Sequence, residues 1–265
     1  FDIEGVSGVA HAHGIPLIVD NTVATPYLIR PLEWGADIVV HSLTKYMGGH
    51  GNSVAGAIVD SGKFPWAEHK ERFRRLNEPD VSYHGVVYTE ALGPAAYIGR
   101  ARVVPLRNTG AALSPFNAFL ILQGLETLPL RMQRHSDNTL AVAKFLAGHS
   151  AVKWVSYPGL ENDKYRALAK KYCPKGAGAV FTFGLKGGYD AGLALVKNLQ
   201  LFSHLANVGD TRSLVIHPAS TTHRQLTDEQ KVASGAGPDV VRLSIGIEDV
   251  GDIIADLDQA LNKGV

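Results

Sequence analysis

Residues 15–56 read IPLIVDNTVATPYLIRPLEWGADIVVHSLTKYMGGHGNSVAG, and within them two short apolar runs end abruptly at polar residues. The first run, residues 15–19, stops at Asp20, and the second, residues 36–40, stops at His41 and Ser42. Runs of this length, rich in Val and Ile and separated by turn residues, are typical of buried parallel strands in an α/β sheet. Ligands of such sheets bind at the carboxyl ends of the strands. We therefore expect the chemistry at Asp20 and just after Ser42.

Lys45 lies in this position, although most lysines are simply solvated surface charges. Its neighbours favour a functional role, because Ser42 and Thr44 precede it and glycines follow at positions 48, 49 and 51. Hydroxyl groups and unhindered backbone N–H groups can form part of a phosphate-binding cup. The nucleotide-binding pattern G-x-x-x-x-G-K-[ST] does not occur in the chain, so a nucleotide-hydrolysing function loses its main support.

A carboxylate, a phosphate cup and a lysine together suit a cofactor with a basic ring nitrogen, a phosphate and an aldehyde. Pyridoxal 5'-phosphate has these three groups. A lysine amine captures its aldehyde as an imine, and a carboxylate beside the pyridine nitrogen keeps that nitrogen protonated. On residue spacing alone, a surface role for Lys45 stays open.

The choice between a surface lysine and a cofactor lysine is narrowed by the sequence of residues 19–59, which reads VDNTVATPYLIRPLEWGADIVVHSLTKYMGGHGNSVAGAIV. It closely resembles the cofactor-lysine region of the Cys/Met-metabolism family of pyridoxal-phosphate enzymes, which includes cystathionine synthases and lyases, methionine γ-lyase and the homoserine-ester sulfhydrylases. The resemblance implies that Lys45 carries the Schiff base and that Asp20 faces the pyridine nitrogen. It also implies that Ser42 and Thr44 hold the phosphate.

The same resemblance implies an α/β fold of the aminotransferase-like type, called fold type I. Residues 1–124 would form the later part of a large cofactor-binding domain with a mixed or parallel sheet. Residues 125–265 would form a smaller C-terminal α+β domain. Because family members have well over a hundred residues before the lysine region, and residue 1 is Phe, we expect the chain to be the later part of a longer polypeptide.

Composition excludes several other classes of function. The 265 residues carry 26 basic and 25 acidic side chains, a net charge of +1, so no global field attracts nucleic acid or an acidic membrane. No apolar run approaches the roughly 20 residues that span a bilayer. The single cysteine, Cys173, excludes an internal disulfide and fits the reducing cytoplasm. The basic residues between 70 and 75 indicate a solvated helix face.

The histidines do not predict a metal site. His11 and His13 precede a strand without a further ligand set, and neither H-E-x-x-H nor C-x-x-C occurs. His217 and His223 lie six residues apart across a turn that contains proline. We interpret these side chains as satisfied or solvated histidines.

The remaining pattern predicts alternating helices and strands. Residues 1–13 indicate a crossover helix, residues 54–59 a third strand, residues 64–76 a charged helix and residues 77–88 a long loop. Helical pattern follows over residues 90–104, interrupted at Gly93 and Pro94. Ser114 is expected to cap a helix that starts at Pro115, followed by a second long helix through residue 146. The apolar residues expected to be buried there are Phe116, Phe119, Leu120, Leu125 and Leu128. Further strands are predicted at 152–156, 179–185, 213–216 and 240–245, and helices at 164–171, 189–199, 227–230 and 249–261.

Two segments of this second half carry candidate substrate residues. Arg242 lies inside an apolar strand, where a guanidinium is costly unless it is paired, and an outward, partly exposed position is the alternative. VRLSIGIED, residues 241–249, resembles the family motif whose arginine binds the substrate α-carboxylate by a bidentate bond. The segment SLVIHPASTTH, residues 213–223, resembles the strand and loop that line the substrate pocket, where Ser213 would help to orient the carboxylate.

Within the family, residues 77–119 and the segment HPASTTHRQL look most like O-acetylhomoserine sulfhydrylases. The implied reaction replaces the acetate of O-acetyl-L-homoserine with sulfide, giving L-homocysteine. Lys45 would take the α-proton and carry it to the cofactor. The implied assembly is a homo-oligomer, a dimer of dimers, with sites shared between subunits.

Three alternatives stay open. A cystathionine γ-synthase would use the same residues with cysteine as acceptor, and a γ-lyase would use water. The third alternative is a non-catalytic fragment that lacks the upstream half of the site. The sequence also leaves acetyl and succinyl esters undistinguished.

Overall fold

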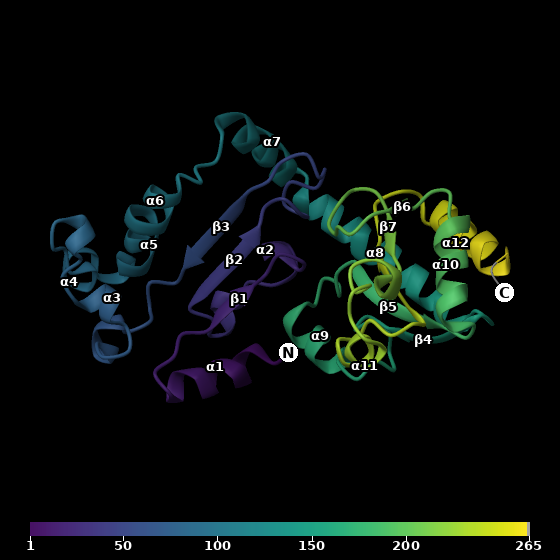
Figure 1. Ribbon diagram of the computed structural model, residues 1–265, viewed down its shortest axis with the longest axis horizontal. Helices are drawn as coiled ribbons and strands as arrows, with labels where there is room; N and C mark the ends of the chain where they lie inside the picture. Colours follow the sequence, from purple (N-terminus) through teal and green to yellow (C-terminus); the bar gives the residue numbers. More distant parts are fainter. Residues whose placement is uncertain (264–265) are drawn as a thin grey trace. The chain divides into compact units, whose positions relative to one another are not determined.

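The chain folds around two sheets, each in its own unit of the computed structural model, which describes residues 1–263 (Figure 1). The first unit comprises Phe1–Thr22, Arg30–Leu43 and Val54–Leu120. The second comprises Val23–Ile29, Thr44–Ser53 and the residues from Ile121 onward. The domain boundary expected after residue 124 stays a prediction.

The first unit is built on a three-stranded sheet. Helix α1 (Ile3–Ala12) is followed by Gly14, whose left-handed backbone at φ +62° lets the chain turn toward β1 (Ile18–Asp20). Strand β1 pairs in parallel with β2 (Ile38–Ser42), as predicted, with Asp20 opposite Val40. Strand β3 (Gly56–Asp60) runs antiparallel to β2. The short 3-10 helix η1 (Pro31–Trp34) precedes β2, and α2 (Thr25–Leu28) belongs to the second unit.

The charged helix predicted over residues 64–76 is wrong. The segment forms a 3-10 turn, η2 (Trp66–His69), and one short helix, α3 (Arg74–Asn77). The rings of Phe64 and Phe73 pack on Trp66, with centroids 4.7 Å and 4.9 Å from its ring. Side chains two positions apart on an α-helix do not face each other, so this aromatic cluster and a continuous helix exclude one another. The basic residues between 70 and 75 are exposed, as predicted.

The rest of the first unit follows the sequence pattern more closely. Most of the predicted loop over residues 77–88 is irregular, and the helical pattern after it is interrupted at Gly93 and Pro94. The elements in this stretch are η3 (Val81–Tyr83), α4 (Tyr88–Leu92), η4 (Gly93–Ala95), α5 (Ala96–Ala101), the π-helix η5 (Arg102–Leu106) and α6 (Arg107–Thr109).

Two helices follow, α7 (Pro115–Glu126) and α8 (Leu128–Gly148), separated at Thr127. The predicted cap is present, because the Ser114 hydroxyl accepts a hydrogen bond from the Asn117 N–H at 3.1 Å. The expected burial of Phe116 and Phe119 is wrong. These side chains are 68% and 52% exposed, because no other part of the described chain covers that face of α7.

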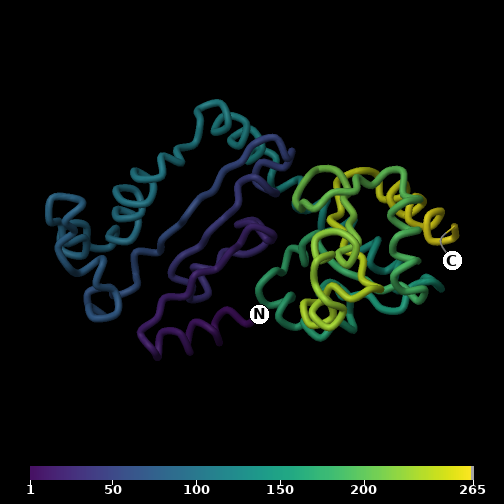
Figure 2. Tube along the Cα trace, in the orientation of Figure 1, coloured from purple at the N-terminus to yellow at the C-terminus, as the bar shows by residue number. Residues whose placement is uncertain are grey.

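The second unit is a five-stranded sheet in the order β4-β5-β8-β7-β6, with β4 (Val152–Ser156), β5 (Val180–Leu185), β6 (Ser203–His204), β7 (Leu214–Ile216) and β8 (Val240–Ser244). Helices α8, α10 (Gly188–Asn198) and α12 (Val250–Lys263) lie beside this sheet (Figure 2). Buried side chains of these helices and of the sheet form one apolar core. Shorter elements are α9 (Arg166–Tyr172), η6 (Pro218–Ser220) and α11 (Asp228–Ala233). The predicted strands and helices of this half are confirmed to within a few residues, and α11 begins with a capping box formed by Thr227 and Gln230.

His135 of α8 is fully buried, and burial lowers its pKa to about 4. Its Nδ1 lies 2.6 Å from the carbonyl oxygen of Ile245, which accepts a hydrogen bond from the neutral ring. The unfolded chain therefore binds a proton here from pH 6.5 downward, while the folded chain does not until about pH 4. The free energy of unfolding must therefore decrease as pH is lowered from 6.5 to about 4.

We expect the His135→Gln variant to lose part of that pH dependence. Lowering the pKa from 6.5 to about 4 corresponds to about 3 kcal/mol of unfolding free energy, which the natural protein loses as pH falls from 7 to 4. Urea unfolding at several pH values measures it, with His204→Gln as the control because His204 is exposed. Equal pH slopes for the natural protein and His135→Gln would contradict the assignment.

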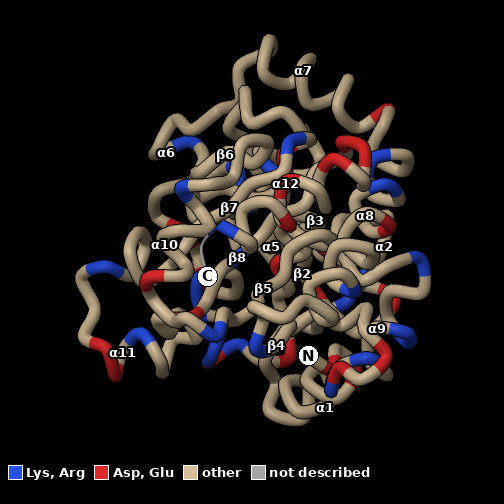
Figure 3. Tube along the Cα trace, turned by 90° about the vertical axis from the view of Figure 1, so that its right-hand side faces the viewer, with Lys and Arg blue, Asp and Glu red and all other residues tan. Residues whose placement is uncertain are grey.

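Positions of Lys and Arg are interspersed with positions of Asp and Glu along the chain (Figure 3). On α11, for example, Lys231 lies 3.0 Å from the Asp228 carboxylate. In residues 1–263, no helix combines the length and the apolar character that crossing a membrane requires.

Candidate active site

The carboxyl ends of β1 and β2 lie at one edge of the first sheet and present Asp20 and Ser42. Asp20 is exposed, and its carboxylate accepts a hydrogen bond from the Thr22 N–H at 2.9 Å. Hydrogen bonds from the Thr22 side chain and backbone hold the pKa of Asp20 below its usual value. The carboxylate is therefore a stable anion at neutral pH, as a partner of a protonated ring nitrogen must be.

Ser42 and Thr44 are both half-buried on the segment that leaves β2. The Ser42 N–H donates to the Thr22 hydroxyl at 2.7 Å, so Thr22 fixes both Asp20 and the end of β2. Ser42 belongs to the first unit and Thr44 to the second. Their role in holding a phosphate stays a prediction.

Lys45 belongs to the second unit, where it is half-buried, and its Nζ donates a hydrogen bond to Oδ1 of Asn207. The backbone closes into a turn after it, since the Gly49 N–H donates to the Lys45 carbonyl oxygen at 2.7 Å. We call residues 45–49 the Lys45 turn. Gly209, at φ +80°, lies so close to the turn that an added Cβ would be 2.6 Å from the Tyr46 nitrogen. Only glycine fits there, and this close approach brings Asn207 to the lysine.

Arg242 meets the same asparagine from β8. Its Nη2 lies 3.4 Å from the Asn207 carbonyl oxygen, and burial lowers the pKa of the guanidinium. Val241 and Leu243 face the core, so Arg242 alternates onto the other side of the strand and is half-buried there. The second unit thus brings an amine and a guanidinium together around Asn207.

Sequence reasoning missed Asn207. The residue lies in the loop between β6 and β7 and is 162 positions from Lys45 in the chain. A single asparagine in a loop has no spacing pattern that marks it. The only local signal is Gly209, whose left-handed backbone indicates a close approach but does not identify the partner.

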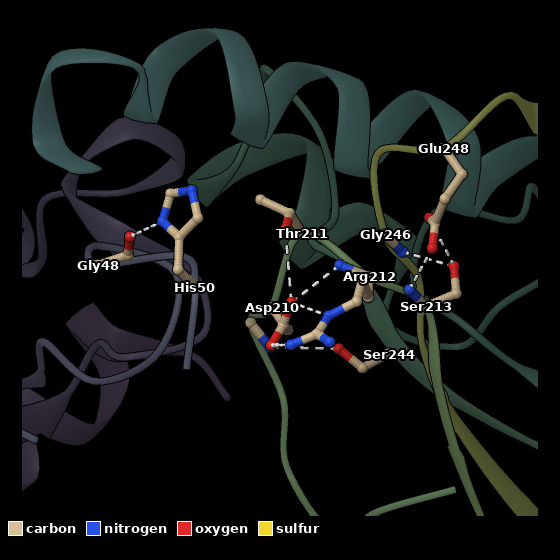
Figure 4. Close-up of polar contacts among 10 residues, drawn as sticks. Gly48, His50, Asp210, Thr211, Arg212, Ser213, Ser244, Gly246 and Glu248 are labelled. Atoms are coloured by element: carbon tan, nitrogen blue, oxygen red, sulfur yellow. Dashed lines mark hydrogen bonds and ion pairs between the residues drawn. The ribbon is translucent and has the colours of Figure 1, made fainter. Parts of the chain in front are cut away.

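Ser213 is fully buried, and its contacts are with Glu248 and Gly246 (Figure 4). Its hydroxyl donates to Oε2 of Glu248 at 3.0 Å and accepts from the Gly246 N–H at 2.9 Å. Its backbone N–H donates to Oε1 of the same carboxylate at 2.6 Å. These bonds join the start of β7 to the end of β8, and the role of Ser213 toward a substrate stays a prediction.

Other polar groups have partners that account for them structurally. His217 is fully buried, with Nε2 2.8 Å from the Pro238 carbonyl oxygen and Nδ1 3.0 Å from the Ser220 hydroxyl. His11 lies 2.7 Å from the Asp37 carboxylate. Burial raises the pKa of the Cys173 thiol, so the thiolate is disfavoured. Residues 1–263 contain no group of three or more His, Cys, Asp or Glu side chains that could hold a metal ion.

Comparison with known proteins gives a consistent result. Residues 1–262 match the family model described as Cys/Met metabolism PLP-dependent enzyme. The homocysteine synthase of Schizosaccharomyces pombe is 54% identical over 98% of this chain and 61% of its own length. The O-acetyl-L-homoserine sulfhydrylase of Leptospira meyeri is 52% identical over 99% of this chain and 61% of its own length. The chain thus spans about three fifths of the length of these relatives.

A crystal structure from Campylobacter jejuni, of a protein assigned as an O-acetylhomoserine (thiol)-lyase, has a TM-score of 0.92 to this chain. It is 43% identical and covers 98% of this chain, which in turn covers 62% of it. That protein carries N'-pyridoxyl-lysine-5'-monophosphate. The similarity confirms the predicted fold class, the aminotransferase-like fold type I.

Proposed function

Because the chain belongs to the Cys/Met-metabolism family of pyridoxal-phosphate-dependent enzymes, we propose that the protein containing it replaces the acetate of O-acetyl-L-homoserine with sulfide. The products are L-homocysteine and acetate. The observation that carries the proposal is the meeting of Lys45 and Arg242 around Asn207. An amino-acid substrate needs a carboxylate-binding cation and, beside it, an amine that can move the α-proton.

The residues present fit pyridoxal phosphate by their chemistry. Asp20 supplies a carboxylate that is held as an anion, Lys45 an amine, and Ser42 and Thr44 hydroxyl groups for a phosphate. When bound, the cofactor supplies an aldehyde that bonds to amines and a protonated ring that withdraws electrons from the substrate carbon atoms. In this scheme Lys45 holds the cofactor and then moves the proton of the substrate α-carbon. Arg242 binds the α-carboxylate and so orients the substrate.

The test is product analysis with the natural protein and a choice of acceptors. O-acetyl-L-homoserine with sulfide should give homocysteine and acetate in equal amounts. Faster formation of cystathionine with cysteine as acceptor would instead favour a cystathionine γ-synthase. Release of a keto acid and ammonia in the absence of any thiol would favour a γ-lyase. A parallel assay with the succinyl ester decides the ester preference. No turnover under any of these conditions would contradict the enzymatic proposal.

Location and assembly also remain proposals. We propose a homo-oligomer, a dimer of dimers whose sites are shared between subunits. We also propose a cytoplasmic location, with which the single cysteine of the chain agrees. Light scattering of the natural protein measures the subunit number. A monomeric protein with full activity would contradict shared sites.

The charge of Asp20 leads to a specific prediction. Because hydrogen bonds from Thr22 lower the pKa of Asp20, the carboxylate stays ionised as pH falls. It loses its charge only below the usual pKa of an aspartate. We expect Asp20→Asn to lower kcat by about 100-fold, since a neutral amide does not stabilise a protonated ring nitrogen. Steady-state kinetics measure it, with Asp137→Asn as the control because Asp137 is exposed on α8. Asp20→Asn with unchanged kcat would show that the carboxylate does not face the ring.

A further inference from the structure

Arg131, in the first turn of α8, is only 6% exposed and has no carboxylate among its hydrogen-bond partners in residues 1–263. Its Nε donates to the Thr127 hydroxyl at 3.1 Å. Its terminal nitrogens donate to three backbone carbonyl oxygens, those of Tyr46 at 2.7 Å, Gly124 at 2.6 Å and Met47 at 3.3 Å. The guanidinium is thus held almost entirely by main-chain oxygens.

This position is costly for the charge because the guanidinium is buried. The helix dipoles do not decide the balance, since Arg131 lies at the positive start of α8 but contacts the Gly124 carbonyl oxygen in the last turn of α7, where a cation is favoured. Burial also lowers the pKa of Arg131, because the charged form loses water. A buried cation without an acidic partner is costly, so its hydrogen bonds must compensate for the lost water. The partners of Arg131 show which part of the chain these bonds hold.

Two of the three carbonyl groups belong to Tyr46 and Met47, the residues directly after Lys45. Arg131 therefore fixes two consecutive peptide planes of the Lys45 turn. The turn is also held from its other side, where the Thr211 N–H donates to the Gly49 carbonyl oxygen at 2.9 Å. Gly49 leaves room for the guanidinium, because an added Cβ would lie 2.5 Å from Nη1 of Arg131.

We propose that Arg131 is a positioning residue for Lys45: it clamps the Lys45 turn so that the amine is presented in one direction. The inference rests on the proposed function of Lys45. A lysine has four rotatable side-chain bonds, so only a fixed backbone can aim its amine reproducibly. Misplacement of a reacting group by about 1 Å can lower a rate by about 100-fold.

The main test replaces Arg131 with Met in the natural full-length protein. We expect kcat to fall by about 100-fold with a much smaller change in KM, together with slower fixation of the cofactor on Lys45 by borohydride. In the cofactor-free protein, hydrogen–deuterium exchange should speed up for the amides of residues 46–49. Arg134→Met is the matched control, because Arg134 is exposed on the same helix.

A second variant moves the turn and leaves Arg131 in place. Gly124 lies on α7 against the turn, and an added Cβ would lie 2.7 Å from the Met47 carbonyl oxygen and closer still to that of Gly48. Gly124→Ala should therefore reproduce the fall in kcat and the faster exchange. Arg131→Lys should not restore activity, since one ammonium cannot reproduce the planar fork of a guanidinium.

The outcomes separate this inference from the proposed function. If Arg131→Met and Gly124→Ala lose thermal stability but keep normal kcat and normal fixation on Lys45, Arg131 is only structural and the inference is overturned. If Arg131→Met does not fold, Gly124→Ala alone decides by the same measurements. If the natural protein itself captures no cofactor on Lys45, the proposed function fails. Unchanged exchange of residues 46–49 in both variants would then overturn the clamp independently.

Discussion

Replacing Lys45 with alanine is expected to lower kcat by about 1000-fold or more and to abolish covalent capture of pyridoxal phosphate. The amine is the group that bonds to the cofactor, and it also moves the α-proton, so both contributions are lost together. Absorbance of the bound cofactor and steady-state kinetics measure the two losses.

The site of attachment can be read directly in the natural protein. Borohydride reduction followed by peptide mapping should find the cofactor on Lys45 alone. Lys70→Ala is the matched control, because Lys70 is exposed in the first unit and should leave capture and kcat unchanged. A label on any other lysine would refute the assignment of Lys45, whatever the kinetics of the variants.

The parts of the site that the sequence predicts are those with a local cause. Asp20 and Ser42 follow apolar runs, and a run that ends at a polar residue marks a strand end without knowledge of the fold. The parallel pairing of β1 and β2 then brings these two residues to one edge of the sheet. Thr44 and Lys45 follow in the chain within three residues of the strand end.

The parts that the sequence does not predict depend on contacts between distant segments. Asn207 lies 162 positions from Lys45, and Arg131 lies 85 positions from Tyr46. Neither belongs to a pattern that periodicity or spacing could mark. Arg131 lies at the start of α8, but its guanidinium contacts the Gly124 carbonyl oxygen in the last turn of α7, and only the folded chain shows this contact.

Failures of the secondary-structure prediction have the same origin. The apolar and charged residues between 64 and 76 fit a helical period, but aromatic packing on Trp66 decides the backbone instead. Phe116 and Phe119 have the apolar character of core residues, yet burial needs a partner surface, and the described chain places none over them. Periodicity predicts which secondary structure a segment can form and which side chains can be buried, whereas packing decides which of these occur.

Replacing Arg242 with alanine is expected to weaken substrate use and to leave the cofactor lysine intact. Loss of a bidentate, partly desolvated pair between a guanidinium and a carboxylate costs about 2–5 kcal/mol, which corresponds to a fall in kcat/KM of about 30-fold to 5000-fold. Because Arg242 is half-buried, we expect the lower part of this range. Arg242→Lys keeps the charge but loses the planar fork, so its kcat/KM should lie between those of the natural protein and the alanine variant.

Two measurements distinguish this role from a structural one. Within residues 1–263, Arg242 donates one long hydrogen bond, 3.4 Å, to the Asn207 carbonyl oxygen, whereas Lys45 contacts the Asn207 side chain. Fixation of the cofactor on Lys45 by borohydride should therefore proceed normally in Arg242→Ala, while the KM for the amino-acid substrate rises. Arg224→Ala is the matched control, since Arg224 is exposed in the same unit. If Arg242→Ala instead loses cofactor capture with an unchanged KM, the guanidinium supports the Lys45 environment through Asn207 and does not bind the substrate carboxylate.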